Sequence, residues 1–200
     1  MKTWIFALGF LLWGGTLAAQ VRESLAIGKA LPMEDWKMES VEGEEVSLID
    51  EMGPQGLLVI FSCNTCPYVI KAQDRTQELI DYALEREIGV IILNSNQAQR
   101  DGVDSREAMA DYAQEHGYTV PYVMDDDSRL ADAFGATRTP EVFLFNKEKV
   151  LVYKGAMEDQ PANPPASEQI FLQMAIDHML AEKPIDPEHT VSVGCTIKRK

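Results

Sequence analysis

Runs of apolar residues separated by turn residues predict the first strands and helix of the chain. The five apolar residues of Leu57–Phe61 and the four of Val90–Leu93 have the length and composition of buried strands. Between these runs the apolar positions recur at helical spacing, and Pro67 falls in the first turn, where a missing backbone N–H costs no helical hydrogen bond. Gly89 stands where this helix would end. The apolar positions of the predicted helix are Val69, Ala72, Leu79, Ile80, Ala83 and Leu84.

Shorter elements continue the pattern in the second half of the chain. A helix capped by Asp104 or Ser105 is predicted to end near His116, and Val120–Met124 indicates a third strand. Ser128–Phe134 predicts a short helix that the following glycine ends. Because strands alternate with helices at this spacing, we expect the central strands to pair in parallel, with helices on both faces.

Two hairpins are predicted at the margins of this sheet. Residues Glu141–Phe145 and Val150–Tyr153 are joined by four polar residues, which predicts an antiparallel hairpin at the sheet edge. Near the N-terminus, Trp36–Ser40 and Val46–Ile49 flank a glutamate- and glycine-rich turn and predict a hairpin extension. The fold class is therefore α/β, with a central mixed sheet.

A last helix and an extended tail complete the chain. The helix is expected to be capped by Ser167, to end at about Ala181, and to pack its apolar residues on the sheet. Prolines then introduce a C-terminal tail, residues 184–200, which we expect to dock on the domain of residues 20–183. The apolar residues of the helix are Ile170, Phe171, Met174, Ala175 and Met179.

Residues 1–19 have the layout of a cleaved secretory signal. Lys2 supplies a positive charge, Trp4–Leu12 an apolar stretch, and Gly14–Ala19 a run of small residues for cleavage near Ala18 or Ala19. An uncleaved membrane anchor is the alternative, but glycines interrupt an apolar run that is shorter than the roughly 20 residues of a spanning helix. We therefore expect a periplasmic or secreted protein without stable membrane association after cleavage.

Composition limits the partners of the predicted domain. The chain has 200 residues, of which 46% are hydrophobic and 25% charged, which suits one compact domain with a sizeable core. Its formal net charge of −14 argues against nucleic acid or an anionic membrane as a partner. The basic residues cluster only at Lys198–Lys200.

Two cysteines follow the first buried strand directly. Cys63 and Cys66 are separated by two residues and lie where the strand gives way to a helix, whose N-terminal N–H groups and dipole stabilise a thiolate. We therefore expect Cys63 to be the exposed, acidic nucleophile and Cys66 the thiol that resolves the mixed disulfide. A zinc site or two unreactive core cysteines are the alternatives. A structural zinc site needs two more ligands, and the chain offers only Cys195 and three isolated histidines.

Five stretches of the sequence resemble a known family. They are FSCNTCPYV at 61–69, ILNSN at 92–96, VPYVMDD at 120–126, FGATRTPEVFLF at 134–145 and VGCTIK at 193–198. The chain is similar, from about Leu25 to its end, to bacterial thioredoxin-like proteins related to the alkyl hydroperoxide reductase/thiol-specific antioxidant group. The resemblance implies a thioredoxin-like fold with a disulfide-exchange or peroxidase site at Cys63 and Cys66.

The same resemblance assigns a role to Thr139 and Pro140. In thioredoxin folds the corresponding proline is cis and faces the two cysteines, so the backbone of Thr139 would be free to bind an extended substrate as an added strand. An ordinary trans proline is the alternative. Arg138 lies two positions away from the arginine of peroxiredoxins, whose reactive cysteine would match Cys66. The buried carboxylate of typical thioredoxins has no counterpart in the first buried strand.

The function expected from these features is an exported thiol–disulfide oxidoreductase that needs no cofactor. Its substrates would be protein or small-molecule disulfides, with a separate redox protein as its electron partner. A thiol peroxidase that reduces hydroperoxides is the first alternative, and a metal-binding module that uses Cys63, Cys66 and a third ligand such as Cys195 is the second. Cys195 is either a small buried hydrophobe or an additional resolving thiol that the tail brings near the pair.

Overall fold

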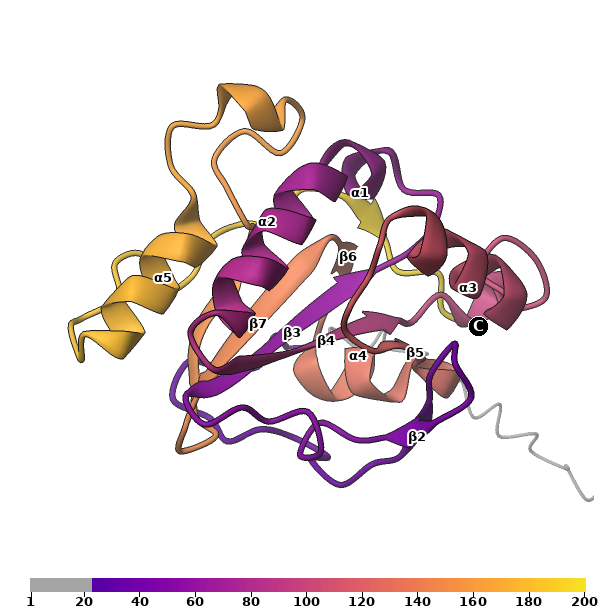
Figure 1. Cartoon of the computed structure of the whole chain (residues 1–200), viewed down its shortest axis with the longest axis horizontal. Coiled ribbons are helices and arrows are strands. Elements are labelled where there is room, and N and C mark those ends of the chain that lie inside the picture. The colour runs from indigo at the N-terminus through magenta and orange to yellow at the C-terminus, as the bar shows by residue number, and fades with distance from the viewer. Residues whose placement is uncertain (1–22) are drawn as a thin grey trace, which may run out of the picture.

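The computed structural model describes residues 23–200. It contains a five-stranded sheet with the strand order β5-β4-β3-β7-β8 (Figure 1). Strands β3, β4 and β5 are parallel to one another, and β7 pairs antiparallel with both β3 and β8. The predicted mixed sheet and edge hairpin are confirmed. The strands are β3 (Gly56–Ser62), β4 (Ile88–Asn94), β5 (Tyr122–Met124), β7 (Glu141–Asn146) and β8 (Leu151–Gly155).

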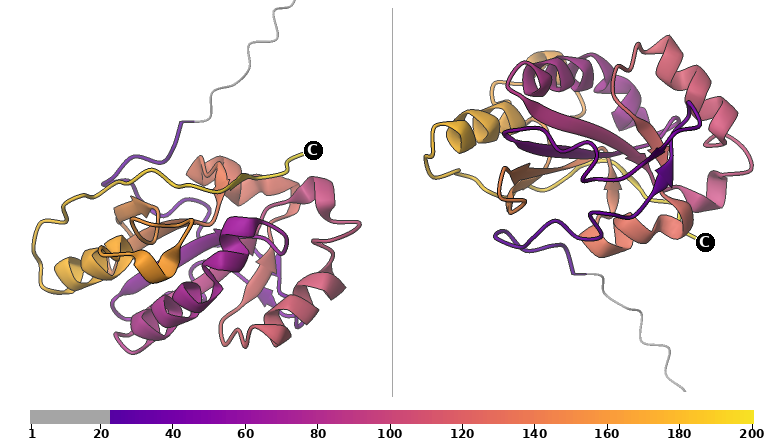
Figure 2. Two further views of the ribbon diagram at one scale, coloured as in Figure 1. Left: turned by 90° about the horizontal axis from the view of Figure 1, so that it is seen from above. Right: turned by 60° about the horizontal axis from the view of Figure 1, so that its bottom comes forward.

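Helices cover both faces of the sheet. All seven residues of β3 are buried, as its apolar run predicts, because the strand lies in the middle of the sheet between two hydrophobic clusters. Helices α2 (Gln73–Leu84), α3 (Arg106–Glu115) and α5 (Phe171–Leu180) pack on one face. Helix α4 (Arg129–Phe134) packs on the other, together with the N-terminal hairpin and Ile197 of the tail (Figure 2).

Several short elements lie around this sheet. The predicted N-terminal hairpin consists of β1 (Met38–Glu39) and β2 (Glu45–Val46), which pair antiparallel. Strand β6 (Arg138–Thr139) pairs antiparallel with β9 (Cys195–Thr196) of the tail, and α1 (Pro67–Lys71) precedes α2. The 3-10 helices are η1 (Gln97–Gln99), η2 (Asp126–Ser128) and η3 (Pro164–Ala166).

The helix predicted after the two cysteines is different in the structure. It is interrupted at Ala72, and its second part ends at Leu84 rather than near Gly89. Gly89 lies within β4, where a Cβ atom would come 1.7 Å from the carbonyl oxygen of Glu51. This glycine therefore permits close approach of two backbones and does not end a helix. By contrast, Gly135 ends α4 in the left-handed conformation with φ 62°, as predicted.

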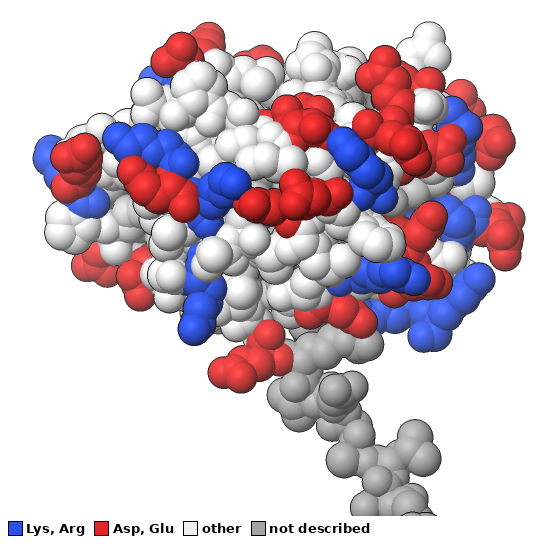
Figure 3. Space-filling view, turned by 90° about the horizontal axis from the view of Figure 1, so that it is seen from below, with Lys and Arg blue, Asp and Glu red and all other residues white. Residues whose placement is uncertain are grey.

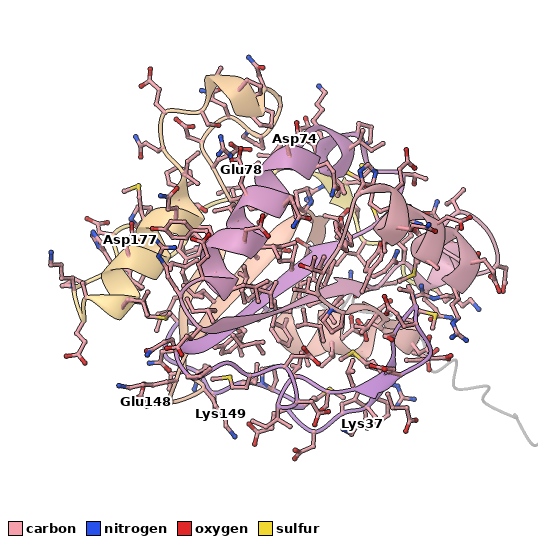
Figure 4. The ribbon with its side chains drawn as sticks, viewed as in Figure 1. Lys37, Asp74, Glu78, Glu148, Lys149 and Asp177 are labelled. Carbon is pink, nitrogen blue, oxygen red and sulfur yellow. The ribbon has the colours of Figure 1, made fainter. Side chains whose placement is uncertain are left out.

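The prediction for the last helix is wrong in two details. Ser167 does not cap α5, which begins at Phe171, and its hydroxyl instead accepts a hydrogen bond from the backbone N–H of Gln160. Met174 is exposed, and the buried residues of the helix are Leu172, Ala175 and Ile176. Helix α5 also contacts α2, where the hydroxyl of Tyr82 donates to Asp177, which is labelled in Figure 4.

Some predictions concern parts of the chain that the structure does not describe. The signal of residues 1–19 lies outside residues 23–200, and the domain boundaries stay predictions. Within residues 23–200, none of the helices has the length and apolar character needed to cross a membrane. Acidic and basic side chains are interspersed over much of the face in Figure 3, in spite of the net charge of −14.

Candidate active site

The two cysteines lie between the end of β3 and the start of α1. Cys63 follows the last residue of the strand, and Cys66 is the N-cap of the helix, whose first residue is Pro67. The proline removes an N–H that would have no helical partner. The N–H of Val69, in the first turn of α1, helps to lower the pKa of the Cys66 thiol. Cys66 therefore lies at a helix N-terminus, and Cys63 lies three positions earlier, directly after β3.

Both sulfurs contact the residue before a cis proline. The Thr139–Pro140 peptide is cis, as predicted. The Cys63 Sγ atom lies 3.2 Å from Thr139 Oγ1, and the Cys66 Sγ atom lies 3.1 Å from the carbonyl oxygen of Thr139, to which Cys66 donates only when it is protonated. The structure thus brings Cys63, Cys66, Thr139 and Pro140 together, although 73 residues separate Cys66 from Thr139.

Two expectations for this site are wrong. Cys63 is not exposed, because both Cys63 and Cys66 are 2% accessible to solvent. The backbone of Thr139 is not free either, because it pairs with Cys195 in the β6–β9 ladder. The chain's own tail fills the place that was predicted for a substrate strand.

The more acidic thiol is Cys66 and not Cys63. A hydrogen bond from the Cys63 thiol, joined by donors from Cys195 and the N–H of Val69, lowers the pKa of Cys66 to about 4. The same hydrogen bond and burial raise the pKa of Cys63, and the nearby Asp104 carboxylate adds to the rise. The sequence instead predicts Cys63 as the nucleophile and Cys66 as the resolving thiol, and these roles stay predictions, because one hydrogen bond couples the titration of the two thiols.

This acidity predicts the pH dependence of the reduced protein. Because the pKa of Cys66 is depressed, its thiolate is expected to persist above about pH 4 and to be lost only as the pH falls through that value. Ultraviolet thiolate absorbance measured against pH should show this midpoint in the wild type and lose it in Cys66→Ser. A midpoint near the ordinary cysteine value, about 8.5, would contradict the prediction.

A buried carboxylate that the sequence did not reveal holds the loop between the cysteines. Asp104 is fully buried and accepts hydrogen bonds from the backbone N–H of Asn64 at 3.0 Å and from the side-chain amides of Asn94 and Asn96, each at 2.8 Å. The sequence indicates Asp104 only as a possible helix cap, but Ser105 fills that role by accepting from the N–H of Ala108. The buried carboxylate of typical thioredoxins is expected in the first buried strand, whereas Asp104 comes from the loop before α3.

The other candidate residues do not reach the thiols. The guanidinium of Arg138 donates to Gly194 O at 3.4 Å and Thr196 Oγ1 at 3.2 Å, so it binds the tail. Among residues 23–200, no group of three or more His, Cys, Asp or Glu side chains has an arrangement that could hold a metal ion. The metal-binding alternative therefore has no geometric support in that part of the chain.

Comparison with known proteins places this geometry in context. Residues 26–170 match the family model described as Redoxin. A curated relative, the thiol-disulfide oxidoreductase ResA of Bacillus subtilis (strain 168), is 23% identical over 148 residues, which are 74% of this chain and 76% of ResA.

Two solved structures of similar sequence have the same fold. A hypothetical protein from Sinorhizobium meliloti 1021 has a TM-score of 0.79 and 28% identity, over 89% of this chain and 97% of that protein. An uncharacterized conserved protein from Geobacillus kaustophilus has a TM-score of 0.79 and 29% identity, over 88% of this chain and 93% of that protein. The expected thioredoxin-like fold is therefore confirmed, and these neighbours share nearly the whole described chain.

Proposed function

The chain belongs to the Redoxin family, and from this premise we propose that it is a thiol–disulfide oxidoreductase whose redox pair is Cys63 and Cys66. The observation that carries the proposal is the contact of both sulfurs with the residue before a cis proline, at 3.2 and 3.1 Å. Two thiols that share one proton at a helix N-terminus supply an attacking thiolate and a second thiol in one place.

The proposed reaction reverses the order that the sequence predicted for the two cysteines. The Cys66 thiolate attacks a substrate disulfide, one substrate sulfur leaves as a thiolate, and a mixed disulfide forms at Cys66. Cys63 then gives up its proton and attacks the Cys66 sulfur, which expels the second substrate thiolate. The substrate gains two electrons and the pair becomes a Cys63–Cys66 disulfide. The reverse sequence of steps oxidises a dithiol.

We propose the same substrate and partner classes that the sequence suggested. The substrates are protein or small-molecule disulfides, and a separate redox protein restores the starting state of the pair. The signal-like residues 1–19 support export to the periplasm or secretion, a compartment in which disulfide chemistry persists.

Redox titration tests the proposal. Equilibration of the full chain with mixtures of reduced and oxidised dithiothreitol should oxidise Cys63 and Cys66 together as a single two-electron couple, and the oxidised protein should pass its disulfide to reduced insulin chains. Alkylation followed by peptide mass analysis measures both results. If Cys63 and Cys66 are still alkylated freely after oxidation, the proposed function is wrong.

A thiol peroxidase is the second candidate, and the acidity of Cys66 favours it. The pKa of Cys66 is lowered to about 4, and this cysteine matches the reactive cysteine of peroxiredoxins in the resemblance described above. Arg138, however, binds the tail and not the thiol. Peroxide consumption that survives Cys63→Ser but not Cys66→Ser would support the peroxidase over the exchange reaction.

A further inference from the structure

The C-terminal tail is fixed along its length by hydrogen bonds to other parts of the domain. Where it passes the edge strand β8, the N–H of Thr190 donates to Lys154 O at 3.1 Å and the N–H of Lys154 donates to Glu188 O at 3.2 Å. Beyond β9, the N–H of Ile197 donates to Thr137 O at 3.1 Å, and Ile197 is 4% exposed. In Figure 2 the tail, in yellow, follows one side of the molecule from α5 onward.

The part of the tail that meets the thiols has the geometry of a bound substrate strand. Cys195 is opposite Thr139 in the antiparallel β6–β9 pair, directly before the cis proline. Gly194 permits this approach, because a Cβ atom there would lie 2.1 Å from the carbonyl oxygen of Thr139. The pairing is the strand addition by which domains bind extended peptides, here made by the chain itself.

This register brings a third sulfur to the redox pair. The backbone N–H of Cys195 donates to the Cys66 Sγ atom at 3.3 Å, and the Cys195 side chain also lowers the pKa of Cys66. Cys195 packs against the buried cluster of Cys63, Cys66 and Val69 but is itself only half-buried. Cys66 is thus the middle sulfur of three, and Cys195 is the outer one.

We propose that Cys195 is a third redox thiol and that the tail is an internal substrate strand, which takes the disulfide over from the buried Cys63–Cys66 pair. This inference rests on the proposed function, because it needs the Cys63–Cys66 disulfide as its starting point.

The proposed step is an exchange within the chain and needs no outside oxidant. The Cys195 thiolate attacks the Cys66 sulfur of the Cys63–Cys66 disulfide, a Cys66–Cys195 bond forms, and Cys63 leaves as a thiolate that accepts the proton given up by Cys195. One disulfide breaks and one forms, so the oxidation state of the protein does not change. The disulfide moves from two buried cysteines to one that includes the half-buried Cys195. A redox partner protein can then attack Cys195 without entering the covered site.

Disulfide mapping of the full chain tests this transfer. Wild type, Cys63→Ser and Cys195→Ser are oxidised with one equivalent of diamide, quenched in acid, alkylated and digested. We expect Cys63→Ser to form the Cys66–Cys195 disulfide, wild type to contain it beside the Cys63–Cys66 disulfide, and Cys195→Ser to contain only the latter. A freely alkylated Cys195 in Cys63→Ser, with an intact Cys63–Cys66 disulfide in wild type, overturns the inference and leaves the proposed function standing. Absence of the Cys63–Cys66 disulfide from both wild type and Cys195→Ser overturns the proposed function instead.

A variant that keeps all three cysteines tests the role of docking. In the Cys63→Ser background, Gly194→Ala should lower the yield of the Cys66–Cys195 disulfide about tenfold or more, because docking holds the two sulfurs at a high effective concentration. Gly102→Ala is the matched control, since its added Cβ atom would meet only one atom, at 3.8 Å. An equal yield in both variants would contradict the docked-strand role of the tail.

Discussion

Replacement of Cys66 with serine is expected to slow disulfide exchange by a factor on the order of 10³ or more, because the substitution removes the attacking thiolate and the sulfur that accepts the second bond. Cys66 contacts both other cysteines, so no remaining pair can replace it. The rate of insulin-disulfide reduction by wild type and variant, at equal protein concentration, measures the effect. A variant with wild-type rate would exclude Cys66 from the reaction.

Cys63→Ser is the comparison that establishes the order of attack. If the Cys66 thiolate attacks first, the double variant Cys63→Ser with Cys195→Ser should accumulate a mixed disulfide between Cys66 and the substrate, because no resolving thiol remains. The reciprocal variant, Cys66→Ser with Cys195→Ser, should trap less substrate. It lacks the hydrogen bond with Cys66 that raises the pKa of Cys63 most, but burial and the Asp104 carboxylate still raise that pKa. Trapping at Cys63 and not at Cys66 would restore the order predicted from the sequence.

Features that are encoded by neighbouring residues could be predicted from the sequence. The five apolar residues of Leu57–Phe61 predict a buried strand by themselves. Gly135 ends α4 because glycine readily adopts the left-handed conformation. The role of Gly89 was not predictable in this way. It depends on the backbone of Glu51, which β3, α1 and α2 separate from Gly89 in the chain, and the local pattern resembles an ordinary helix end. The error at Ser167 has the same origin, since its hydroxyl binds the N–H of Gln160 and not a helix N-terminus.

In the candidate site, too, some features are encoded by neighbouring residues and others depend on distant segments. The spacing of Cys63 and Cys66 after a buried strand is local, so the pair and its place at a helix start could be predicted. The hydrogen bond from Cys63 lowers the pKa of Cys66 most and is local, but further donors come from Cys195, which is 129 positions away from Cys66 in the sequence. The tail likewise fills the strand-binding edge of Thr139 through contacts between segments that are distant in the chain.

Asp104 is the residue whose position most depended on the fold. It comes from the loop before α3, yet its carboxylate supports the loop between Cys63 and Cys66 through the N–H of Asn64. Its other bonds lead to the end of β4 and onward to the tail, because Asn96 donates to Asp104 and its amide oxygen accepts from the N–H of Lys198 at 2.8 Å. One buried carboxylate therefore holds both the redox loop and the segment that covers it.

Asp104→Ala is expected to lower the free energy of unfolding by roughly 3–5 kcal/mol, because it removes three hydrogen bonds from buried groups and each such loss costs about 1–3 kcal/mol. Asp104→Asn should cost less, since its remaining oxygen can still accept from Asn64 and Asn94 while its amide group faces the amide of Asn96. Urea denaturation of the fully reduced proteins, followed by circular dichroism, measures these differences.

Asp101→Ala is the matched control for the charge of this loop. Asp101 is exposed and lies three positions before Asp104, so its removal changes the net charge equally without leaving a buried donor unpaired. We expect it to change the free energy of unfolding by no more than about 0.5 kcal/mol. Equal losses in Asp101→Ala and Asp104→Ala would show that charge and not hydrogen bonding accounts for the effect. A larger loss in Asp104→Ala alone, with faster alkylation of Cys195, would follow from release of Asn64 and, through Asn96, of the tail.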